Sequence, residues 1–425
     1  MKIYGKEEKM KKRTQKFLTA VLTAAMLTST QGDGGMSNNT KVFAADTNKS
    51  NSQVIKIDGS TANKNPQTAY RGIGAVSCNG TSRLMMDYKE KNPKAYWEIM
   101  RWLFDKDEGA GLSLVKVELG CDLDTSSGAE PATKRSEDEK ANVNRGAGFM
   151  FAHDAQVINP DVEVDMLCWS MPEWVSEEYE VSAKKGYQAR YKWYKETIDA
   201  VYDTWNVKVN YVSANKNEKE LEVDWTIYLA NALENEKNEK YDYDKIKIVA
   251  ADETDTMYIA DKMLKNKKYR NAVDVLGFHY NSYMSKNVLK LNKEYGKEIW
   301  FSEGTSVATD SIFGSNNTTD GVSTSGTNGM LDVANRIIIG YGMSNMTMYE
   351  FQPSVAAFYD GSVYYPKQLI TANKPWSGYY EIGNGLVMTM HFTNFIKKGW
   401  QYITSGCYGD GTQSNHCITD TKDDY

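Results

Sequence analysis

Acidic side chains that follow strand-like segments are the residues of this sequence best suited by type and spacing to chemistry. In a protein built on parallel strands, reactive groups stand at the last positions of the strands or just beyond them. Two such carboxylates have informative surroundings, because Glu218 follows Asn217 and Glu303 follows Ile-Trp-Phe-Ser. The acidic residues at positions of this kind are Glu118, Glu173, Glu218, Asp252, Glu253, Glu303 and Glu350.

Carboxyl groups at Glu218 and Glu303 could together hydrolyse a glycosidic bond. In the retaining form of this reaction, one carboxylic acid protonates the leaving oxygen and one carboxylate attacks the anomeric carbon, with about 5 Å between them. The Asn217 amide could then hydrogen-bond the sugar 2-hydroxyl. Asn-Glu alone is a weak signal, and Glu218 could equally be a solvated loop charge beside Lys216. Glu303 is harder to explain in that way, because an unpaired carboxylate is costly to bury.

Two other acidic residues have simpler interpretations. Glu118 lies between Val117 and Leu119, so we expect a core carboxylate that pairs with Lys116 or Arg83. Glu350 could line the same pocket as the catalytic pair.

Aromatic side chains near the strand ends form a second group of candidates. Sugar rings have apolar C–H faces that stack on such side chains, and the chain has 10 Trp and 28 Tyr. A single aromatic residue is more often part of the core than of a binding site. The position of Trp169 and Tyr349 at strand ends favours the pocket, so we predict that both line it.

The elements that must position these residues alternate along the chain. Short β-branched or aromatic runs are separated by amphipathic segments such as 94–104, 191–205, 255–264 and 331–340, which is typical of βα units. No Gly-rich dinucleotide fingerprint follows a strand. The pattern therefore predicts an α/β fold, a (β/α)8 TIM barrel. Its expected strands are 71–77, 113–120, 163–170, 207–214, 245–250, 272–279, 298–302 and 345–351.

Two polar segments interrupt this pattern. Residues 126–145 follow the second strand, and residues 305–327 follow the seventh. Both should lie over the carboxyl ends of the strands, where barrel enzymes build their active sites. We expect the middle of each to be a disordered surface insertion.

Composition and the first 45 residues predict an exported protein. Residues 1–45 carry a net charge of +5 and the remaining residues −11, so nucleic acid is an unsuitable partner. A basic run precedes an apolar stretch from Phe17 to Leu27, and Ala44 and Ala45 follow, as in a signal peptide. That stretch is too short to span a bilayer. We therefore predict a secreted protein without stable membrane insertion.

Cysteine and histidine usage argues against a metal or another cofactor. The five Cys and four His are scattered, with no C-x-x-C spacing.

Near the end of the chain the pattern changes to aromatic and Gly-rich sequence. We predict a signal peptide at 1–45, a catalytic barrel at 46–392, and the start of a truncated β-sandwich at 393–425. An exposed apolar patch is expected around Phe392, Phe395, Ile396 and Trp400.

Several segments in collinear order resemble glycoside hydrolase family 59, the galactocerebrosidase family. Among them are Trp169-Ser-Met-Pro-Glu-Trp174, Val275-Leu-Gly-Phe-His-Tyr280 and Lys374-Pro-Trp-Ser-Gly378. Together they cover nearly all of residues 70–405, which is more specific than any single motif. The other matching segments are 72–77, 81–84, 116–120, 128–131, 300–303 and 399–400.

The resemblance implies a barrel with a β-sandwich attached and a retaining hydrolase of terminal β-galactosides, on a glycan or a glycolipid. It makes Glu218 the proton donor and Glu303 the nucleophile. It also implies sugar contacts by Thr125, Trp169, Asn217 and Tyr349. Lys216 stands where animal members of the family have Trp, and a cation facing the pocket would lower the pKa of the acid. We therefore expect Lys216 to point away from it.

Two other interpretations remain open at this point. The same barrel and glutamates would suit another sugar, as in a β-glucosidase or an endo-acting glycanase. Lys216 and the expected truncation would also suit a catalytically inactive barrel that binds carbohydrate. Turnover of a galactoside separates the last interpretation from the others, and a substrate panel separates the first two.

Overall fold

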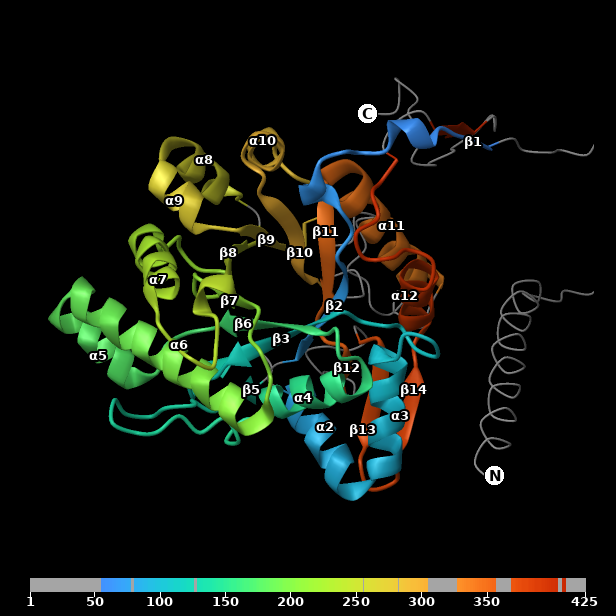
Figure 1. Ribbon diagram of the computed structural model, residues 1–425. Helices are drawn as coiled ribbons and strands as arrows, with labels where there is room; N and C mark the ends of the chain where they lie inside the picture. Colours follow the sequence, from blue (N-terminus) through green and yellow to red (C-terminus); the bar gives the residue numbers. More distant parts are fainter. Residues whose placement is uncertain are drawn as a thin grey trace, which may run out of the picture. The chain divides into compact units, whose positions relative to one another are not determined.

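A closed barrel of eight parallel strands forms the centre of the molecule (Figure 1). The structure, a computed structural model, describes residues 55–77, 80–125, 128–254, 256–281, 283–304, 327–356, 368–403 and 407–409. Each strand overlaps one predicted segment, so the (β/α)8 prediction is confirmed. In spatial order the strands are β10 (Glu298–Gly304), β11 (Met346–Phe351), β2 (Gly72–Ser77), β3 (Leu114–Leu119), β6 (Glu163–Cys168), β7 (Tyr211–Ser213), β8 (Lys247–Glu253) and β9 (Val275–His279).

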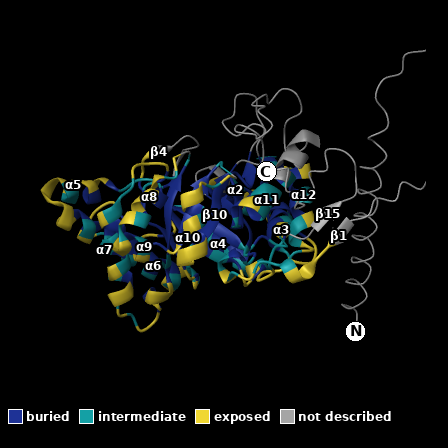
Figure 2. Ribbon diagram, turned by 90° about the horizontal axis from the view of Figure 1, so that it is seen from above, coloured by how far each residue is buried: buried dark blue, intermediate teal, exposed yellow. Residues whose placement is uncertain are grey.

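Helices surround the barrel and cover the outer face of its sheet. Figure 2 shows buried residues concentrated at the centre and exposed ones on the outer helices. Within the described residues, no helix combines the length and the apolar character needed to cross a bilayer. The helices are α2 (Gly80–Lys91), α3 (Pro93–Phe104), α4 (Gly148–Ile158), α5 (Glu173–Val181), α6 (Ala183–Trp205), α7 (Val223–Asn235), α8 (Tyr258–Lys265), α9 (Lys267–Ala272), α10 (Lys286–Tyr295), α11 (Thr327–Ser344) and α12 (Asn384–Thr393).

Local sequence determines where these helices begin and end, as α10 illustrates. The Ser285 side chain accepts a hydrogen bond from the Val288 backbone, which satisfies one of the free N–H groups of the first turn. Gly296 ends the helix at φ 64°, a left-handed conformation that glycine adopts without a steric penalty. The helix then buries Val288 and Leu291 against the barrel.

The interior of the barrel is layered, because alternate residues of each strand point inward. One layer is apolar and consists of Leu114, Tyr211, Val249, Val275, Trp300 and Met348. Two positions further along their strands, the inward residues are polar or charged, and they include Lys116, Ser302 and Glu350. The barrel therefore changes from an apolar to a charged interior toward the carboxyl ends of its strands.

Gly277 makes room for this charged layer. A Cβ atom at that position would lie 2.7 Å from Ser302 Oγ and 2.9 Å from Asp252 Oδ1. Neither neighbour can withdraw freely, because the Ser302 hydroxyl donates a 2.8 Å hydrogen bond to Asp252 Oδ1. Any larger residue would therefore push apart the groups beneath the barrel mouth.

Part of the polar segment 126–145 proves to be well tied to the barrel. Arg135 forms an ion pair of 2.7 Å with Asp122, and Lys134 forms one with Glu196 on α6. The Thr133 hydroxyl lies 2.7 Å from that of Thr197 on the same helix. The prediction of a disordered middle is therefore wrong for this segment. Residues 305–326, most of the second polar segment, lie outside the described residues, as does the predicted signal peptide.

The described C-terminal segment adds small sheets to the barrel. Strands β12 (Val355–Ala356), β13 (Ile370–Lys374) and β14 (Tyr379–Ile382) form one sheet, and β1 (Ile55–Ile57) pairs with β15 (Cys407–Gly409). Most of the predicted sandwich segment lies outside the described residues, so the boundary at 392 stays a prediction.

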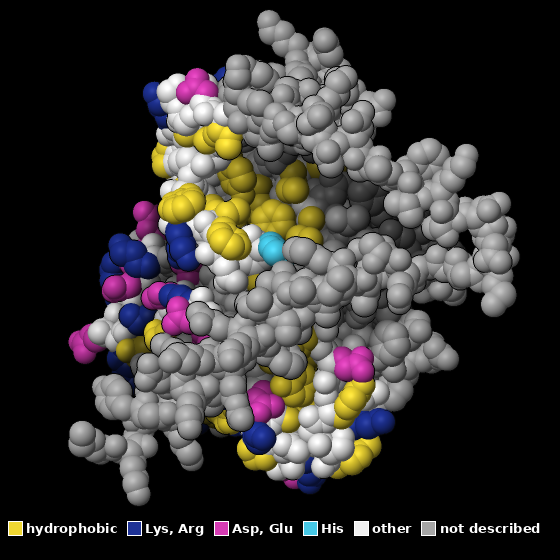
Figure 3. Space-filling view, turned by 90° about the vertical axis from the view of Figure 1, so that its right-hand side faces the viewer, with side chains coloured by type: hydrophobic (Ala, Val, Ile, Leu, Met, Phe, Trp, Pro, Cys, Tyr) yellow, Lys and Arg dark blue, Asp and Glu magenta, His cyan; other side chains and the backbone are white. Residues whose placement is uncertain are grey.

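Apolar side chains gather on the face that carries α12 (Figure 3). Phe395 is 69% and Trp400 56% exposed, as expected for the predicted patch. Phe392 and Ile396 instead pack partly against the core. The predicted patch is therefore only partly exposed.

Candidate active site

Glu303 occupies the end of strand β10 and is almost fully buried, with 5% of the residue exposed. The Tyr280 hydroxyl donates a hydrogen bond of 2.6 Å to Glu303 Oε1. The Tyr280 backbone N–H also donates to the Glu303 carbonyl at 2.8 Å. Two hydrogen bonds from one neighbouring residue therefore fix both the backbone and the carboxyl group of Glu303.

Glu218 lies in the loop that follows β7, and its side chain is 30% exposed. Its backbone has φ 56°, a left-handed conformation that is uncommon for residues other than glycine. The Glu218 N–H donates to the Asp252 carbonyl at 3.2 Å, and the Asn217 N–H donates to the Cys168 carbonyl at 2.8 Å. The loop thus brings Glu218 over the barrel mouth, in contact with solvent.

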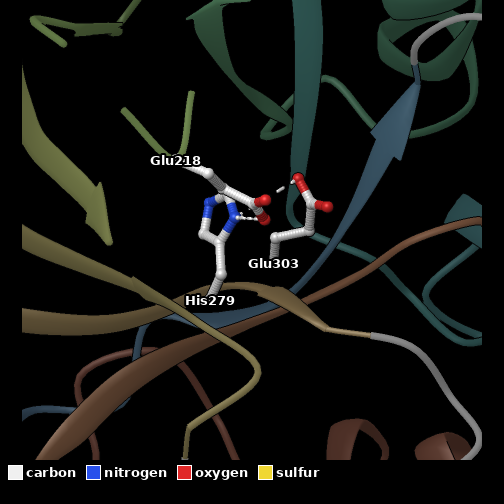
Figure 4. Close-up of side chains that lie close together, drawn as sticks. All are labelled: Glu218, His279 and Glu303. Carbon is white, nitrogen blue, oxygen red and sulfur yellow. Dashed lines mark hydrogen bonds and ion pairs between the residues drawn. The ribbon is translucent and has the colours of Figure 1, made fainter. Parts of the chain in front are cut away.

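His279, the last residue of β9, points its ring toward both glutamates (Figure 4). Its Nδ1 is 2.9 Å from Glu218 Oε1 and 3.8 Å from Glu303 Oε2. One carboxylate oxygen of each glutamate and one His279 nitrogen all lie within 4.8 Å of one another. Residues far apart along the chain therefore meet at one point above the charged layer.

The charge of His279 follows from its neighbours. Burial by itself lowers the pKa of His279, but Glu303, Asp252 and Glu218 outweigh it and raise that pKa to about 10. The imidazole is therefore protonated at neutral pH and can donate from both nitrogens. Nε2 lies 3.2 Å from Asp252 Oδ1, which connects the glutamates to the charged layer below.

Lys116 is the cation at the centre of that layer. Its ammonium donates to the Ser302 carbonyl at 2.7 Å and lies 3.3 to 3.6 Å from carboxylates of Asp252, Glu350 and Asp165. Burial opposes its charge, yet these carboxylates raise the pKa of Lys116 above its ordinary value. Burial also opposes the charge of Asp252, but Lys116 and His279 lower its pKa. Asp252 is therefore ionised and supports the protonated His279.

Burial raises the pKa of two further carboxyl groups near the site. Burial raises the pKa of Glu118 well above its ordinary value, and the charges of Glu130 and Glu303 raise it further. Burial likewise raises the pKa of Glu130 to about 7, although backbone N–H groups of Ala147 and Gly148 oppose the change. The expected partners of Glu118 form ion pairs with other described residues. Lys116 binds the carboxylates of the central layer, and Arg83 pairs with Asp87.

Glu218, His279 and Glu303 also form the one group of metal-ligand side chains gathered closely in the described part of the chain. A histidine must be neutral to bind a metal ion, and the raised pKa of His279 opposes this. A metal ion at this site would therefore have to displace the proton of His279.

The structure brings together some of the predicted site residues. Glu218 and Glu303 meet, and Asn217 precedes Glu218 with a buried Oδ1 that has no hydrogen-bond partner among the described residues. Trp169 follows β6 and is half-buried. The Thr125 side chain lies outside the described residues, although its backbone forms the short strand β4 (Asp124–Thr125).

Tyr349 is not placed in the pocket. Its ring is 1% exposed and stacks on Phe301, with 4.2 Å between the ring centroids. Both residues belong to the core between sheet and helices, and the neighbouring Glu350 points into the barrel instead. The prediction that Tyr349 contacts the sugar is therefore wrong for this arrangement, because the strand presents its other face to the pocket.

Sequence reasoning missed the roles of His279 and Tyr280. The four histidines look scattered along the sequence, and Tyr280 stands out there only as part of the motif Val275-Leu-Gly-Phe-His-Tyr280. The available signal was position, because both stand at the carboxyl end of the sixth barrel strand, next to the strand that carries Glu303. Among the described residues no ion pair of the Lys216 ammonium with Glu218 is found, and the direction of the Lys216 side chain stays a prediction.

Comparison with known proteins identifies the family. The model of glycosyl hydrolase family 59 matches residues 70–394, well over half of the chain. The chain belongs to glycosyl hydrolase family 59. This confirms the resemblance that the sequence motifs indicated.

Curated relatives of the family 59 chain are longer proteins. It is 29% identical to galactocerebrosidase of Danio rerio over 364 residues, which cover 83% of this chain and 49% of the relative. Galactocerebrosidase of Homo sapiens is 28% identical over 348 residues, with 79% and 44% covered. The chain thus spans about half the length of the curated relatives it matches. Among solved structures, SrfJ from Salmonella typhimurium shares the fold, with a TM-score of 0.62, 14% identity, and 82% and 79% of the two chains covered.

Proposed function

We propose that this family 59 chain is a retaining glycoside hydrolase that removes terminal β-galactosyl groups from a glycan or glycolipid. The observation that carries the proposal is the approach of carboxylate oxygens of Glu218 and Glu303 to within 4.8 Å. Double displacement needs two carboxyl groups at about this separation, whereas inversion leaves a wider gap for a water molecule. The names of the curated relatives favour galactose as the sugar.

The surroundings of the two glutamates support different roles. Glu303 is buried and accepts a hydrogen bond from Tyr280, so its attacking oxygen is held in one orientation. Glu218 contacts solvent, so it can exchange protons and meet an incoming water molecule. These properties suit Glu303 as the nucleophile and Glu218 as the acid and base.

The first half-reaction transfers the galactosyl group to the enzyme. The Glu218 carboxylic acid gives its proton to the glycosidic oxygen while a Glu303 oxygen attacks the anomeric carbon. The bond from that carbon to the leaving oxygen breaks, the alcohol departs, and an α-galactosyl ester of Glu303 remains. The unpartnered Asn217 Oδ1 is a suitable acceptor for the sugar 2-hydroxyl in this step.

The second half-reaction releases the sugar. The Glu218 carboxylate takes a proton from water as the water oxygen attacks the same carbon. The ester bond to Glu303 breaks, and β-galactose departs. The negative charge thus moves from Glu303 to Glu218 and back during one cycle. Protonated His279 can follow it, because its Nδ1 lies 2.9 Å from one glutamate and 3.8 Å from the other.

The assignment is tested with the purified full chain and an aryl β-galactoside. Wild type should release β-galactose first, as NMR of the initial product shows. Glu218→Gln and Glu303→Gln should lose most of this activity, while Glu294→Gln, a change of an exposed glutamate on α10, should keep it. Initial release of the α-anomer, or equal rates in all four proteins, would contradict the mechanism. Faster hydrolysis of the matching glucoside would assign another sugar.

Export is part of the proposal and rests on residues 1–45. Expression of the full chain in a secreting host should release a protein whose N-terminus follows the apolar stretch. N-terminal sequencing of the protein in the medium checks this. Protein that stays in the cells with residues 1–45 intact would contradict export.

A further inference from the structure

A buried arginine, Arg190 on α6, is used by neither step of the proposed mechanism. Its guanidinium lies over the Trp225 ring, 4.5 Å from the ring centroid, and its side chain is fully buried. Nη1 donates to Glu222 Oε1 at 2.9 Å, and Nη2 donates to the Ala214 carbonyl at 3.0 Å. Arg190 therefore connects a helix outside the barrel with both ends of the loop that carries Glu218.

Glu222 completes the connection at the other end of this loop. While Oε1 accepts from Arg190, Oε2 accepts from the Lys216 backbone N–H at 3.1 Å. Lys216 is two residues before Glu218. One carboxylate thus holds the loop backbone with one oxygen and the buried cation with the other. Trp225 adds a third contact, since its Nε1 donates to the Ala214 carbonyl at 2.8 Å.

The backbone of Glu218 requires support of this kind. A left-handed conformation at a residue other than glycine persists only where its surroundings enforce it. Consecutive N–H groups of the loop are bound here, from Lys216 to Glu222, from Asn217 to the Cys168 carbonyl and from Glu218 to the Asp252 carbonyl. The last two acceptors belong to barrel strands and are fixed by the sheet. The first is a side chain whose own position depends on Arg190.

We propose that Arg190 and Glu222 form a clamp that positions the acid and base Glu218 for protonation of the leaving group. They are positioning residues, since neither touches the reacting atoms. The clamp rests on the proposed function and deepens it. It acts on Glu218 and not on Glu303, because its contacts lie on the loop after β7, whereas Tyr280 and β10 hold Glu303.

Removing the clamp should therefore impair acid catalysis selectively. Leaving groups that depart without a proton need little help from Glu218, and poor leaving groups depend on it. Glu222→Gln leaves one side-chain oxygen to accept from both Arg190 and the Lys216 N–H. Arg190→Lys replaces the planar guanidinium, which donates to Glu222 and to the Ala214 carbonyl, with a single ammonium. General acid catalysis contributes about 10²- to 10⁴-fold, so partial misplacement of Glu218 should cost roughly 10- to 100-fold.

The experiment measures kcat/KM of the full chain on aryl β-galactosides that range from dinitrophenyl to unsubstituted phenyl. For Glu222→Gln and Arg190→Lys we expect a 10- to 100-fold loss on the phenyl galactoside and less than about 3-fold on the dinitrophenyl one. Circular dichroism confirms that each variant is folded, and either variant alone suffices for the test.

Glu163→Gln is the matched control. Glu163 pairs with Arg71 at 3.0 Å at the start of β6, the opposite end of the barrel, and its side chain is 21% exposed, as is that of Glu222. This change should alter both substrates by the same factor. Glu218→Gln provides the reference profile, with a loss that grows as the leaving group becomes poorer.

The possible results separate the clamp from the proposed function. If Glu218→Gln shows the leaving-group dependence and both clamp variants show only a uniform loss, as the control does, the clamp is refuted and the mechanism stands. If Glu218→Gln shows no such dependence, or wild type cleaves none of the galactosides, the proposed function fails and the clamp fails with it.

Discussion

The two glutamates of the site are supported by different parts of the molecule. Glu303 belongs to a strand of the barrel, is buried, and accepts a hydrogen bond from the Tyr280 hydroxyl. Glu218 belongs to a loop and has a left-handed backbone, and its side chain contacts His279. The loop is also bound from outside the barrel, by Glu222 and its partner on α6. One support is part of the sheet and the other is added to it.

This difference corresponds to the roles that we propose for the two groups. A nucleophile needs one orientation and no contact with bulk water, and a strand end inside a barrel provides both. An acid that later acts as a base must give its proton to the leaving group and regain one from water, so it has to reach the surface. A loop holds a side chain in one position less firmly than a strand does, and the contacts of the loop with Glu222 compensate for this at Glu218.

Replacement of Glu303 should have the largest effect. Loss of a nucleophile costs many orders of magnitude, and for Glu303→Gly we expect about a 10⁵-fold fall in kcat on any aryl galactoside. Azide should restore part of the activity of this variant and yield the α-galactosyl azide, since it attacks in place of the missing carboxylate. The matched change at the exposed Glu294 should leave the rate unchanged. Rescue that yields the β-azide would assign the nucleophile elsewhere.

Replacement of Glu218 should have the next largest effect on activity, and the size of this effect should depend on the substrate. For Glu218→Ala we expect about a 10²- to 10⁴-fold loss on phenyl galactoside. On dinitrophenyl galactoside the first step should still occur and the second should become rate-limiting, which an initial burst of dinitrophenol reveals. Azide should then accelerate turnover and yield the β-azide. A loss of equal size on both substrates would remove the contrast between the two glutamates.

Loss of the Tyr280 hydroxyl should have an intermediate effect that is specific to the nucleophile. Its hydrogen bond to Glu303 is made to a charged group, which is worth about 1.5 to 3 kcal/mol, or roughly 10- to 150-fold in rate. Tyr280→Phe should lower kcat/KM by such a factor for all leaving groups alike. Tyr283→Phe, at a neighbouring exposed position, should have no effect. A loss confined to poor leaving groups would mean that Tyr280 supports Glu218 instead.

The sequence predicted the barrel and the two glutamates that meet at its mouth, because both leave local traces. Each strand is a short run of apolar or β-branched residues, and Glu218 and Glu303 follow such runs directly. Collinear motifs added the family. The role of His279 left no such trace, since it arises only when the ends of β7, β9 and β10 converge above Asp252. Nor does any local pattern connect Arg190 to a loop more than 20 residues further along the chain.

The error at Tyr349 has a definite physical origin. A strand of a parallel barrel is buried on both faces, so its hydrophobic pattern does not reveal which residues point inward. In β11 the sequence Met-Thr-Met-Tyr-Glu-Phe has apolar residues together with one polar or charged residue in each register. The ion pair between Lys116 and Glu350 shows which residues of β11 point into the barrel. That ion pair depends on the position of another strand, β3, which carries Lys116. Which side chains of this strand point into the barrel is therefore decided by tertiary contacts and not by the local sequence.

The smallest effect that we expect is a change in stability on replacement of His279, which contacts both glutamates. Its pKa is raised from 6.5 to about 10 in the folded protein, so its contribution to stability is complete below pH 6.5 and is lost as pH rises through 10. His279→Gln should therefore reduce the free energy of unfolding by about 1 to 3 kcal/mol near pH 6 and by less near pH 10. Urea denaturation of both proteins at the two pH values measures the difference. His153→Gln, which changes a partly exposed histidine beside Asp154, is the control for histidine loss as such. If the difference between wild type and His279→Gln grew toward pH 10, His279 would be neutral at pH 6, and it could not follow the charge from Glu303 to Glu218.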